Sequence, residues 1–473
     1  MIRLLILLWV GVIVSIGGCT LSPKYTRPEA PIPSEWPTGA AYQETAAMSG
    51  GPTATEIKWR AFLTDERLQD IMETALNNNR DLRLAALNVQ RARAMYGIQR
   101  AELLPSINAI GSGTKQRVPA DLSSTGKKKI AEEYSVNLGI SSWEIDFFGR
   151  IRSLKERALE EYLATEQARR SAQILLISSV ANAYLTLAAD RENLKLTAAT
   201  LETQETAYNL IRRRFEIGLA SELDLRQAQT QVDIARGDIA RFTQLVAQDE
   251  NALNLLAGTS VPIGLLPTDL DSVRTPQQIS PGISSEVLLH RPDILAAEHR
   301  LKAANANIGA ARATFFPRIS LTTAVGTASS ELSGLFKAGS DTWRFAPQVV
   351  MPIFDARLWS AYDATKLEKE IALTQYERAI QTAFREVSDA LAVRVPVAEQ
   401  LSAQESLVNA LTETYRLSTV RYTKGIDSYL GVLDAQRSLY AAEQVLIVIR
   451  LAKLANQVRL YAVLGGGATE NGS

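Results

Sequence analysis

The chain has 473 residues, with 51 basic and 51 acidic side chains and a formal net charge of zero. This balance gives no attraction to nucleic acid or to an anionic membrane surface, so no nucleic-acid partner is expected. Two histidines, one cysteine and five methionines leave little material for a metal site or a cysteine–histidine catalytic pair. The composition therefore disfavours an enzyme, and we expect no catalytic residue, no metal and no dissociable cofactor.

The amino terminus has the pattern of an export signal. Arg3 supplies a positive charge, Leu4 to Ile16 is an apolar run of 13 residues, and two glycines precede Cys19. A run this short indicates a secretory signal rather than a spanning helix. Cys19 is the only cysteine in the sequence and has no disulfide partner in the chain.

The four residues that end at Cys19 resemble a bacterial lipobox. We therefore expect residues 1–18 to be a lipoprotein signal peptide and Cys19 to carry a covalent lipid, with palmitate among its acyl chains. Thr20, rather than an aspartate, follows the cysteine, which suits sorting to the outer membrane. A plain signal peptide with an incidental cysteine is the alternative.

Residues 19–67 are rich in proline. Proline removes a backbone donor and disfavours both continuous helix and central strand. We expect an extended strap that lies on a folded body. The family resemblance given below would assign this strap to the equatorial region of the fold. Its prolines are Pro23, Pro28, Pro31, Pro33, Pro37 and Pro52.

From about Leu68 onward the sequence repeats itself, with a period of about 210 residues. Asp81 and Pro105 have the same separation as Asp293 and Pro317. Further matches follow in the same order: Gly218 to Leu223 with Gly425 to Leu430, Ala228-Gln229 with Ala435-Gln436, and Leu256-Ala257-Gly258 with Leu464-Gly465-Gly466. We interpret this as an internal duplication, with repeats at 68–258 and 284–466, an equatorial linker at 259–283 and a C-terminal tail at 467–473.

Each repeat is predicted to run helix, two strands, very long helix, tight turn, helix. Segments whose side chains alternate between two faces, as in a strand, follow Pro105 and Pro317. In the second of these segments, one face carries Tyr134, Val136, Leu138 and Ile140. At about 10–14 residues each, the segments match tilted strands of a membrane barrel. The candidate strands are Ser106–Gln116, Tyr134–Phe147, Arg318–Ala328 and Thr342–Phe354, joined by polar loops at 117–133 and 329–341. The alternative is the sheet of a soluble β-sandwich, but four strands that lie among long helices in the sequence fit such a fold poorly.

Residues 151–215 contain no proline and are predicted to form one helix on the order of 100 Å long. An apolar heptad stripe follows from Leu225 to Leu256, with Asp249 as its one polar position. A second stripe from Leu430 to Tyr461 is broken at Arg437 and Gln444. This period predicts knobs-into-holes packing against neighbouring helices. A soluble coiled coil would explain the helices but not the strands between them.

These features together resemble the TolC family of outer membrane factors, most closely the OprM-type multidrug efflux lipoproteins. The resemblance runs from Cys19 to about Gly467. It is carried by the proline-rich start, Arg291-Pro292-Asp293-Ile294, Ile308 to Arg312, Phe316-Pro317, Tyr429, and Leu433 to Leu439.

The resemblance implies an α+β membrane protein that forms a homotrimer. Four strands per chain would complete a 12-stranded outer-membrane β-barrel, continued by a long periplasmic α-helical barrel. The physics agrees, because four strands cannot close a barrel and open edges are not tolerated in lipid. Three chains supply twelve strands and a wide aqueous lumen.

A permanently open pore would leak, and the family places its gate at the helix–turn–helix tips, here 216–224 and 423–434. By this resemblance Asp224 bonds to Tyr422 of a neighbouring hairpin, while Leu430 and Asp434 ring the closed aperture. Leu430 and Asp434 are four residues apart and share one helical face. Threefold symmetry would bring three aspartates together in a cation-attracting ring.

The same tips contain typical turn residues. Gly218 and Gly425 suit the left-handed residue that ends a helix, and Ser221 and Ser428 suit the N-cap of the next helix. Asp224 is also three residues after Ser221, which is a capping box with a purely structural role. For Asp434, the alternative is a solvated surface carboxylate.

Other chemically active residue types in the sequence are interpreted as structural. His290 and His299 are expected to be ordinary residues near a helix start rather than ligands. Gly465-Gly466-Gly467 is expected to end the last helix rather than bind phosphate, because no helix follows it.

The resemblance implies a passive exit channel of a tripartite efflux system, lipid-anchored in the bacterial outer membrane and extending into the periplasm. A periplasmic adaptor (membrane fusion) protein and an inner-membrane pump of the resistance–nodulation–division type would open it and drive drugs or other small toxic compounds through. Alternatives are a duct for type I protein secretion or metal-cation efflux, and a structural envelope lipoprotein. The sequence has no methionine or histidine cluster that favours the metal route.

Overall fold

The computed structural model describes residues 20–42, 54–280 and 284–468. The expected signal peptide and Cys19 lie outside the described residues, as does the end of the expected C-terminal tail. The chain divides into two compact units, and each is described by itself. Unit 1 comprises Met1–Glu29, Asn88–Thr165 and Ala297–Tyr376, and unit 2 comprises Ala30–Leu87, Glu166–Ala296 and Glu377–Ser473.

The element order α4-β1-β2-α5-α6 recurs as α7-β3-β4-α8-α9, which matches the order predicted for each repeat. The α-helices are α2 (Trp59–Phe62), α3 (Glu66–Asn78), α4 (Arg80–Ala101), α5 (Arg150–Glu216), α6 (Glu222–Ala257), α7 (Pro292–Ala313), α8 (Ala356–Thr423) and α9 (Tyr429–Val463). Short 3₁₀ turns occur at Ala40–Tyr42, Ile263–Leu265, Leu270–Ser272, Ser285–His290 and Leu332–Gly334.

The two longest helices are α5 and α8, with 67 and 68 residues. Helix α5 confirms the helix predicted for residues 151–215. Helix α8 continues through Pro396, whose missing N–H removes one hydrogen bond from the helical ladder. One stretch of α5 is long and apolar enough to cross a bilayer, but 61% of it is buried inside the protein, as in the core helix of a soluble domain.

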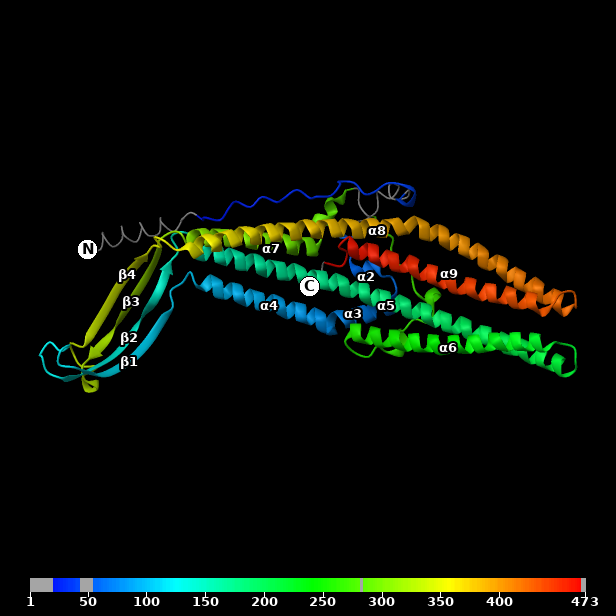
Figure 1. The fold of residues 1–473 in the computed structure, drawn as a ribbon, viewed down its shortest axis with the longest axis horizontal. Helices are drawn as coiled ribbons and strands as arrows, with labels where there is room; N and C mark the ends of the chain where they lie inside the picture. Colours follow the sequence, from blue (N-terminus) through cyan, green and yellow to red (C-terminus); the bar gives the residue numbers. More distant parts are fainter. Residues whose placement is uncertain (1–19, 43–53, 281–283, 469–473) are drawn as a thin grey trace. The chain divides into compact units, whose positions relative to one another are not determined.

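In the described part of unit 1, β1 (Ile107–Val118), β2 (Lys129–Ile145), β3 (Arg318–Ser329) and β4 (Asp341–Val350) form one antiparallel sheet, in that order (Figure 1). The four predicted strands are confirmed, with shifted ends. Strand β2 begins at Lys129, because residues 129–133 pair with 114–118 of β1. The loop predicted at 117–133 was therefore too long. Strand β4 ends at Val350, four residues before its predicted end.

A β-bulge interrupts β2 directly after Ile140, the last residue of the alternation predicted from the sequence. The register steps from Ile140 opposite Thr323 to Trp143 opposite Leu321, so Ser141 and Ser142 together face Thr322. Ser142 has φ +53°, and its N–H donates to Thr322 Oγ1 at 3.2 Å. The extra residue resets the two-residue period, and Trp143 therefore returns to the face that Ile140 occupies.

The register separates the sheet into two chemically different faces. One face is mostly apolar and carries Ile107, Ala109, Val136, Leu138, Ile140, Trp143, Ile145, Ile319, Leu321, Val325, Trp343, Phe345, Pro347 and Val349. The other face is mostly small or polar, with Ile110 as an exception, and carries Asn108, Ser112, Thr114, Ser135, Asn137, Gly139, Ser320, Thr322, Ala324, Gly326, Thr342, Arg344, Ala346 and Gln348. Trp343 is 79% exposed and Phe345 62% exposed, so the described chain leaves the apolar face uncovered.

In unit 1, residues 20–29 run without helix or strand along α5 and α7. Ser22 Oγ lies 3.1 Å from Ser153 Oγ, and Asn305 Nδ2 donates to the carbonyl of Pro23 at 2.8 Å. Tyr25 and Arg27 both donate to the buried carboxylate of Glu298. A Cβ at Gly309 would lie 2.0 Å from Ser22 Oγ, so this close approach requires glycine.

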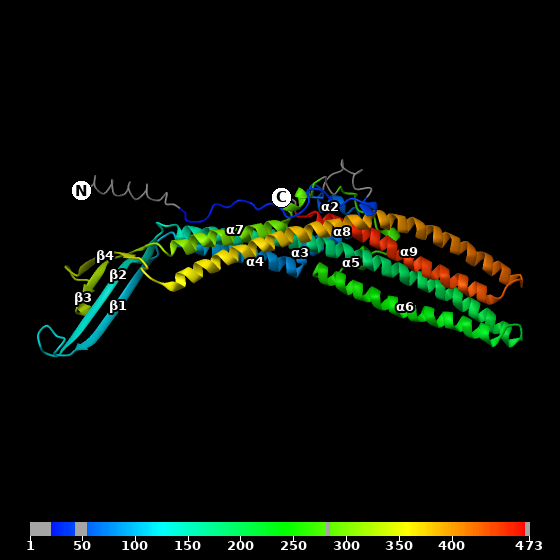
Figure 2. The same cartoon turned by 45° about the horizontal axis from the view of Figure 1, so that its top comes forward.

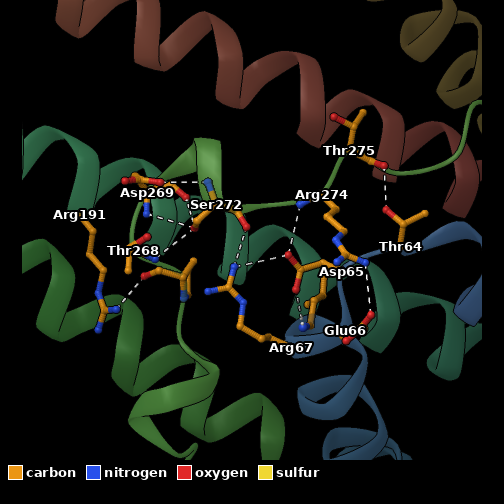
Figure 3. A network of polar contacts seen from close by, with 12 residues as sticks. Thr64, Asp65, Glu66, Arg67, Arg191, Thr268, Asp269, Ser272, Arg274 and Thr275 are labelled. Atoms are coloured by element: carbon orange, nitrogen blue, oxygen red, sulfur yellow. Dashed lines mark hydrogen bonds and ion pairs between the residues drawn. The ribbon is translucent and has the colours of Figure 1, made fainter.

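In unit 2, a polar network around Asp65 fixes the segment 268–275 against the start of α3 (Figure 3). Asp65 is the N-cap of α3 and accepts from the N–H of Leu68 at 3.1 Å. Its other carboxylate oxygen accepts from the N–H of Arg274 at 3.2 Å. Arg67 donates to the carbonyl of Ser272 at 2.6 Å, and Thr64 donates to the carbonyl of Thr275 at 2.9 Å. The long connection after α6 is thus held by directed hydrogen bonds rather than by packing alone.

The heptad positions predicted on α6, from Leu225 to Leu256, are all buried or half-buried. The stripe on α9 is less regular, because Leu430 and Arg437 are exposed in the single chain. Helices α5 and α6 lie side by side in both views (Figure 1 and Figure 2). The first stripe therefore packs within the chain, as its period predicts.

Asp249, the polar member of the first stripe, faces Asp190 of α5. Burial, followed by the charge of Asp190, raises the pKa of Asp249 to about 7. Burial also raises the pKa of Asp190, against the effects of its hydrogen bond with Asp249 and the nearby Arg241. The other charged groups along this contact are already paired, namely Arg191 with Glu250 and Arg241 with Asp238, while Tyr440 of α9 donates to Asp238. Protonation of one of the two aspartates would therefore relieve the repulsion between their carboxylates and stabilise the contact.

This pair predicts a pH-dependent stability. Because the folded pKa of Asp249 lies above its unfolded value, its contribution is fully present below about pH 4 and is lost as the pH rises through about 7. Asp249→Asn should remove this loss, so its melting temperature should exceed that of the parent at pH 8 but not at pH 4. Asp233→Asn, an exposed position on the same helix, is the control. Equal pH slopes in the Asp249 variant and the parent would contradict the assignment.

Candidate functional site

The two helix–turn–helix tips of unit 2 have the same turn geometry. Gly218, between α5 and α6, has φ +76°, and Gly425, between α8 and α9, has φ +70°. The N–H of Leu219 donates to the carbonyl of Arg214 at 2.7 Å, and the N–H of Ile426 donates to the carbonyl of Arg421 at 3.0 Å. A Cβ at either glycine would meet no atom within 4 Å, so the left-handed backbone alone favours glycine at these turns.

The tips differ in how the following helix is capped. Ser221 is the N-cap of α6 and accepts from the N–H of Asp224 at 3.1 Å, while its own N–H donates to Asp224 Oδ2 at 3.2 Å. Ser428 occupies the N-cap of α9 without a side-chain hydrogen bond. At that tip Arg421 Nη2 instead donates to Asp427 Oδ1 at 3.1 Å and lowers the pKa of Asp427. This exposed ion pair was not predicted from the sequence, although its two residues are only six positions apart.

Asp224 and Tyr422 have separate partners in the described chain. Asp224 Oδ2 also accepts from Ser221 Oγ at 2.8 Å, in addition to the two backbone bonds of the capping box. The Tyr422 hydroxyl accepts from Arg214 Nη1 at 3.0 Å, and the guanidinium lies 5.3 Å from the Tyr422 ring centroid. Arg214 was missed in the sequence because it ends a run of three arginines that resembles ordinary charge at a helix C-terminus.

An apolar cluster packs α9 against the first hairpin near these tips. Its buried members are Ile211 from α5, Ala228 from α6, and Tyr429, Val432 and Leu433 from α9. Tyr422 lies at the edge of the cluster, with its ring 5.2 Å from that of Tyr429. The two hairpins of one chain are thus held together by both the cluster and the Arg214–Tyr422 contact.

Leu430 and Asp434 lie on a different face of α9 from the residues of this cluster. Leu430 is 47% exposed, and Asp434 is exposed with its Oδ1 3.9 Å from Arg437 Nη1. The structure therefore places both residues on one accessible face, together with Arg437, which was predicted only as a break in the heptad stripe. At this distance and exposure, the Arg437 contact is a weak one.

The histidines and carboxylates do not gather into a metal centre among the described residues, where no group of three or more potential ligands occurs. His299 Nδ1 lies 2.6 Å from Glu160 Oε2 in unit 1. His290 ends the 3₁₀ turn that precedes α7.

Comparison with known proteins gives consistent matches over most of the chain. The model of the family described as outer membrane efflux protein matches residues 71–259 and 283–466. The toluene efflux pump outer membrane protein TtgC of Pseudomonas putida is 52% identical over 454 residues, which cover 96% of this chain and 93% of the relative. Outer membrane protein OprJ of Pseudomonas aeruginosa is 41% identical over 462 residues, which cover 97% and 95%.

A solved structure shows the same fold. The open state of the MtrE outer membrane channel of Neisseria gonorrhoeae superposes with a TM-score of 0.86 and 38% sequence identity. The match covers 95% of this chain and 99% of that chain. The element order and the four-stranded sheet described above are therefore those of a known channel architecture.

Proposed function

This chain belongs to the outer membrane efflux protein family, and we propose that it is the outer-membrane exit channel of a tripartite efflux system. The family consists of transport channels rather than enzymes, and we propose a passive duct without catalysis. The observation that carries the proposal is the sheet of unit 1, which has one exposed apolar face and one polar face. A strand with these two faces suits a wall between lipid and water.

The sheet also supports a homotrimer. Strands β1 and β4 are the two edges of the sheet in the described chain, and each leaves a row of backbone groups unpaired. Such edges are not tolerated in hydrocarbon, so β4 of one chain would pair with β1 of the next. Three chains then close a 12-stranded barrel, with the apolar face toward lipid and the polar face toward the lumen.

We place the gate at the tips of unit 2, with Leu430 and Asp434 on the pore axis. Asp224 would accept a hydrogen bond from Tyr422 of a neighbouring hairpin. Both hydrogen bonds that Asp224 accepts from Ser221 go to Oδ2, which leaves Oδ1 for this partner. Tyr422 accepts from Arg214, so its own hydroxyl proton is available to donate. The capping box and the gate bond are therefore chemically compatible.

The remaining parts of the proposal concern anchoring and partners. Cys19 would carry a covalent lipid in the outer membrane after removal of residues 1–18, and 19–67 would form the strap. The repeats would be 68–258 and 284–466, with 259–283 as the linker and 467–473 as the tail. A periplasmic adaptor and an inner-membrane pump of the resistance–nodulation–division type would deliver drugs or other small toxic compounds.

Planar-bilayer recording tests the channel function directly. Purified protein should insert and give discrete conductance steps. A structural envelope lipoprotein with the same helices would give none. Protein that is folded by circular dichroism but silent in the bilayer over a wide voltage range would overturn the proposal.

The gate predicts different behaviour for two variants that both break the capping box. A hydrogen bond to a charged group contributes on the order of 1.5–3 kcal/mol, and threefold symmetry repeats it. Asp224→Ala should therefore raise the open probability by several orders of magnitude, whereas Ser221→Ala should leave it close to that of the parent. Tyr422→Phe should act like Asp224→Ala, and Asp434→Asn should lower cation selectivity.

Two outcomes of this comparison are informative. If both Ser221→Ala and Asp224→Ala lower thermal stability and neither changes conductance, Asp224 is only a cap and the gate lies elsewhere. If both open the channel equally, the turn rather than the Asp224–Tyr422 bond holds the gate.

The anchor predicts a covalent modification at one position. Mature protein should begin at Cys19 and carry acyl chains that intact-mass spectrometry detects. Cys19→Ser should lose the acyl mass and slow maturation, while the barrel still retains part of the protein in the membrane. Parent protein without any acyl mass would show that the lipobox interpretation is wrong.

A further inference from the structure

Arg344 is an isolated charge within β4, an edge strand of the sheet of unit 1, away from both ends of the strand. It lies on β4 opposite Ala324, in the same row as Gly139 and Asn108. The alternation places it on the polar face, while its neighbours Trp343 and Phe345 lie on the apolar face. A guanidinium at this position therefore projects from the face that carries small and polar side chains.

The rows around Arg344 contain no other charge among the described residues. From the row of Leu321 to the row of Gly326, about 17 Å of strand at about 3.3 Å per residue, the remaining side chains are uncharged. Asp341 lies three positions away but on the apolar face. The nearest carboxylate on the polar face is Glu144, four rows away, and it already binds Arg150 and Arg318.

Two ion pairs join other charges of the sheet across strands. Lys115 forms an ion pair with Glu132, and Arg318 forms one with Glu144. Arg344 is exposed and has no ion pair with a described residue. Its cross-strand neighbours Ala324 and Gly139 are too small to cover it.

An unpaired arginine at membrane depth is strongly destabilising if it faces lipid near the midplane. Charges inside membrane proteins face water-filled cavities or pair, and they mark the path of the transported species. The polar face of this sheet is the lumen under the trimeric channel proposed above, on which this inference rests. Threefold symmetry would then place three such guanidinium groups in one ring, without carboxylates in their rows.

We propose that Arg344 determines charge selectivity in the barrel of this channel. A ring of three arginines attracts anions and repels cations, and charged rings of this kind set the selectivity of other pores. Anionic cargo, with a carboxylate or phosphate group, passes this part of the lumen more readily than an organic cation of the same size. The charge of this arginine ring is opposite in sign to that of the aspartate ring proposed at the tips.

Reversal potentials in a potassium chloride gradient measure this selectivity. Arg344→Gln should raise the potassium-to-chloride permeability ratio about three- to tenfold, and Arg344→Glu should raise it further. Measuring each variant also in the Asp434→Asn background prevents the proposed aspartate ring from masking the change. Arg117→Gln is the matched control, because it removes the same charge from β1 at a position on the other face, near the turn.

A shift in Arg344→Gln no larger than that in Arg117→Gln overturns the assignment while leaving the channel function intact. Absence of conductance in the parent protein overturns the channel function instead. The two failures are therefore distinguishable.

Cysteine labelling tests the local charge without requiring an open gate. Thr342 lies on the polar face two positions from Arg344, and Trp343 lies on the apolar face between them. In outer-membrane vesicles, Thr342→Cys should react with aqueous methanethiosulfonates and Trp343→Cys should not, with the parent chain as background. For each variant, we compare the labelling rate of the anionic reagent with that of the cationic reagent. This anionic-to-cationic ratio should be several-fold higher in Thr342→Cys than in Thr342→Cys combined with Arg344→Gln. An unchanged ratio of rates, or labelling at Trp343→Cys alone, contradicts the proposal.

Discussion

Backbone N–H and C=O groups along the outer edges of β1 and β4 have no partner within the described chain, and an apolar face of the same sheet is left exposed. In water such a sheet would aggregate, and in hydrocarbon its edges would cost several kcal/mol for each unsatisfied group. Closure with other copies satisfies both requirements at once. The membrane position, the aqueous lumen and the threefold gate of the proposed channel all depend on this closure.

The polar and apolar faces remain distinct along β2 only because the β-bulge resets the alternation after Ile140. Without the bulge at Ser141 and Ser142, Trp143 and Ile145 would turn to the polar face. The hydrogen bond from Ser142 N–H to Thr322 Oγ1 joins the bulge to β3. A local irregularity in one strand thus preserves the separation that lets a lumen carry a charge such as Arg344.

The elements of the fold were largely predictable because their signals are local. The absence of proline through residues 151–215 predicted α5, and the alternation after Pro105 and Pro317 predicted the strands. The bulge was not predictable, because it is defined by the register of β2 against a strand about 180 residues away. The same reason explains the missed aspartate pair, since Asp190 lies on a different helix from the heptad stripe that contains Asp249.

Among the residues at the helix–turn–helix tips, too, some features were predictable from the local sequence and others were not. Glycine and serine at the turns follow from the backbone conformations that a tight hairpin requires, and the structure gives Gly218 and Gly425 the positive φ that glycine favours. The contact of Tyr422 with Arg214 joins two hairpins from different repeats, and no spacing in the sequence encodes it. The proposed gate residues were identified by resemblance alone, because the role proposed for them depends on contacts between chains, which no spacing within one chain encodes.

Closure of the sheet by other copies is the central claim, and the mass of the detergent-extracted protein tests it most directly. Multi-angle light scattering, corrected for bound detergent, should give three times the mass of one chain, and mild denaturation should convert the trimer to unfolded chains without a folded intermediate. A stable monomer with intact β-structure in detergent would contradict the account.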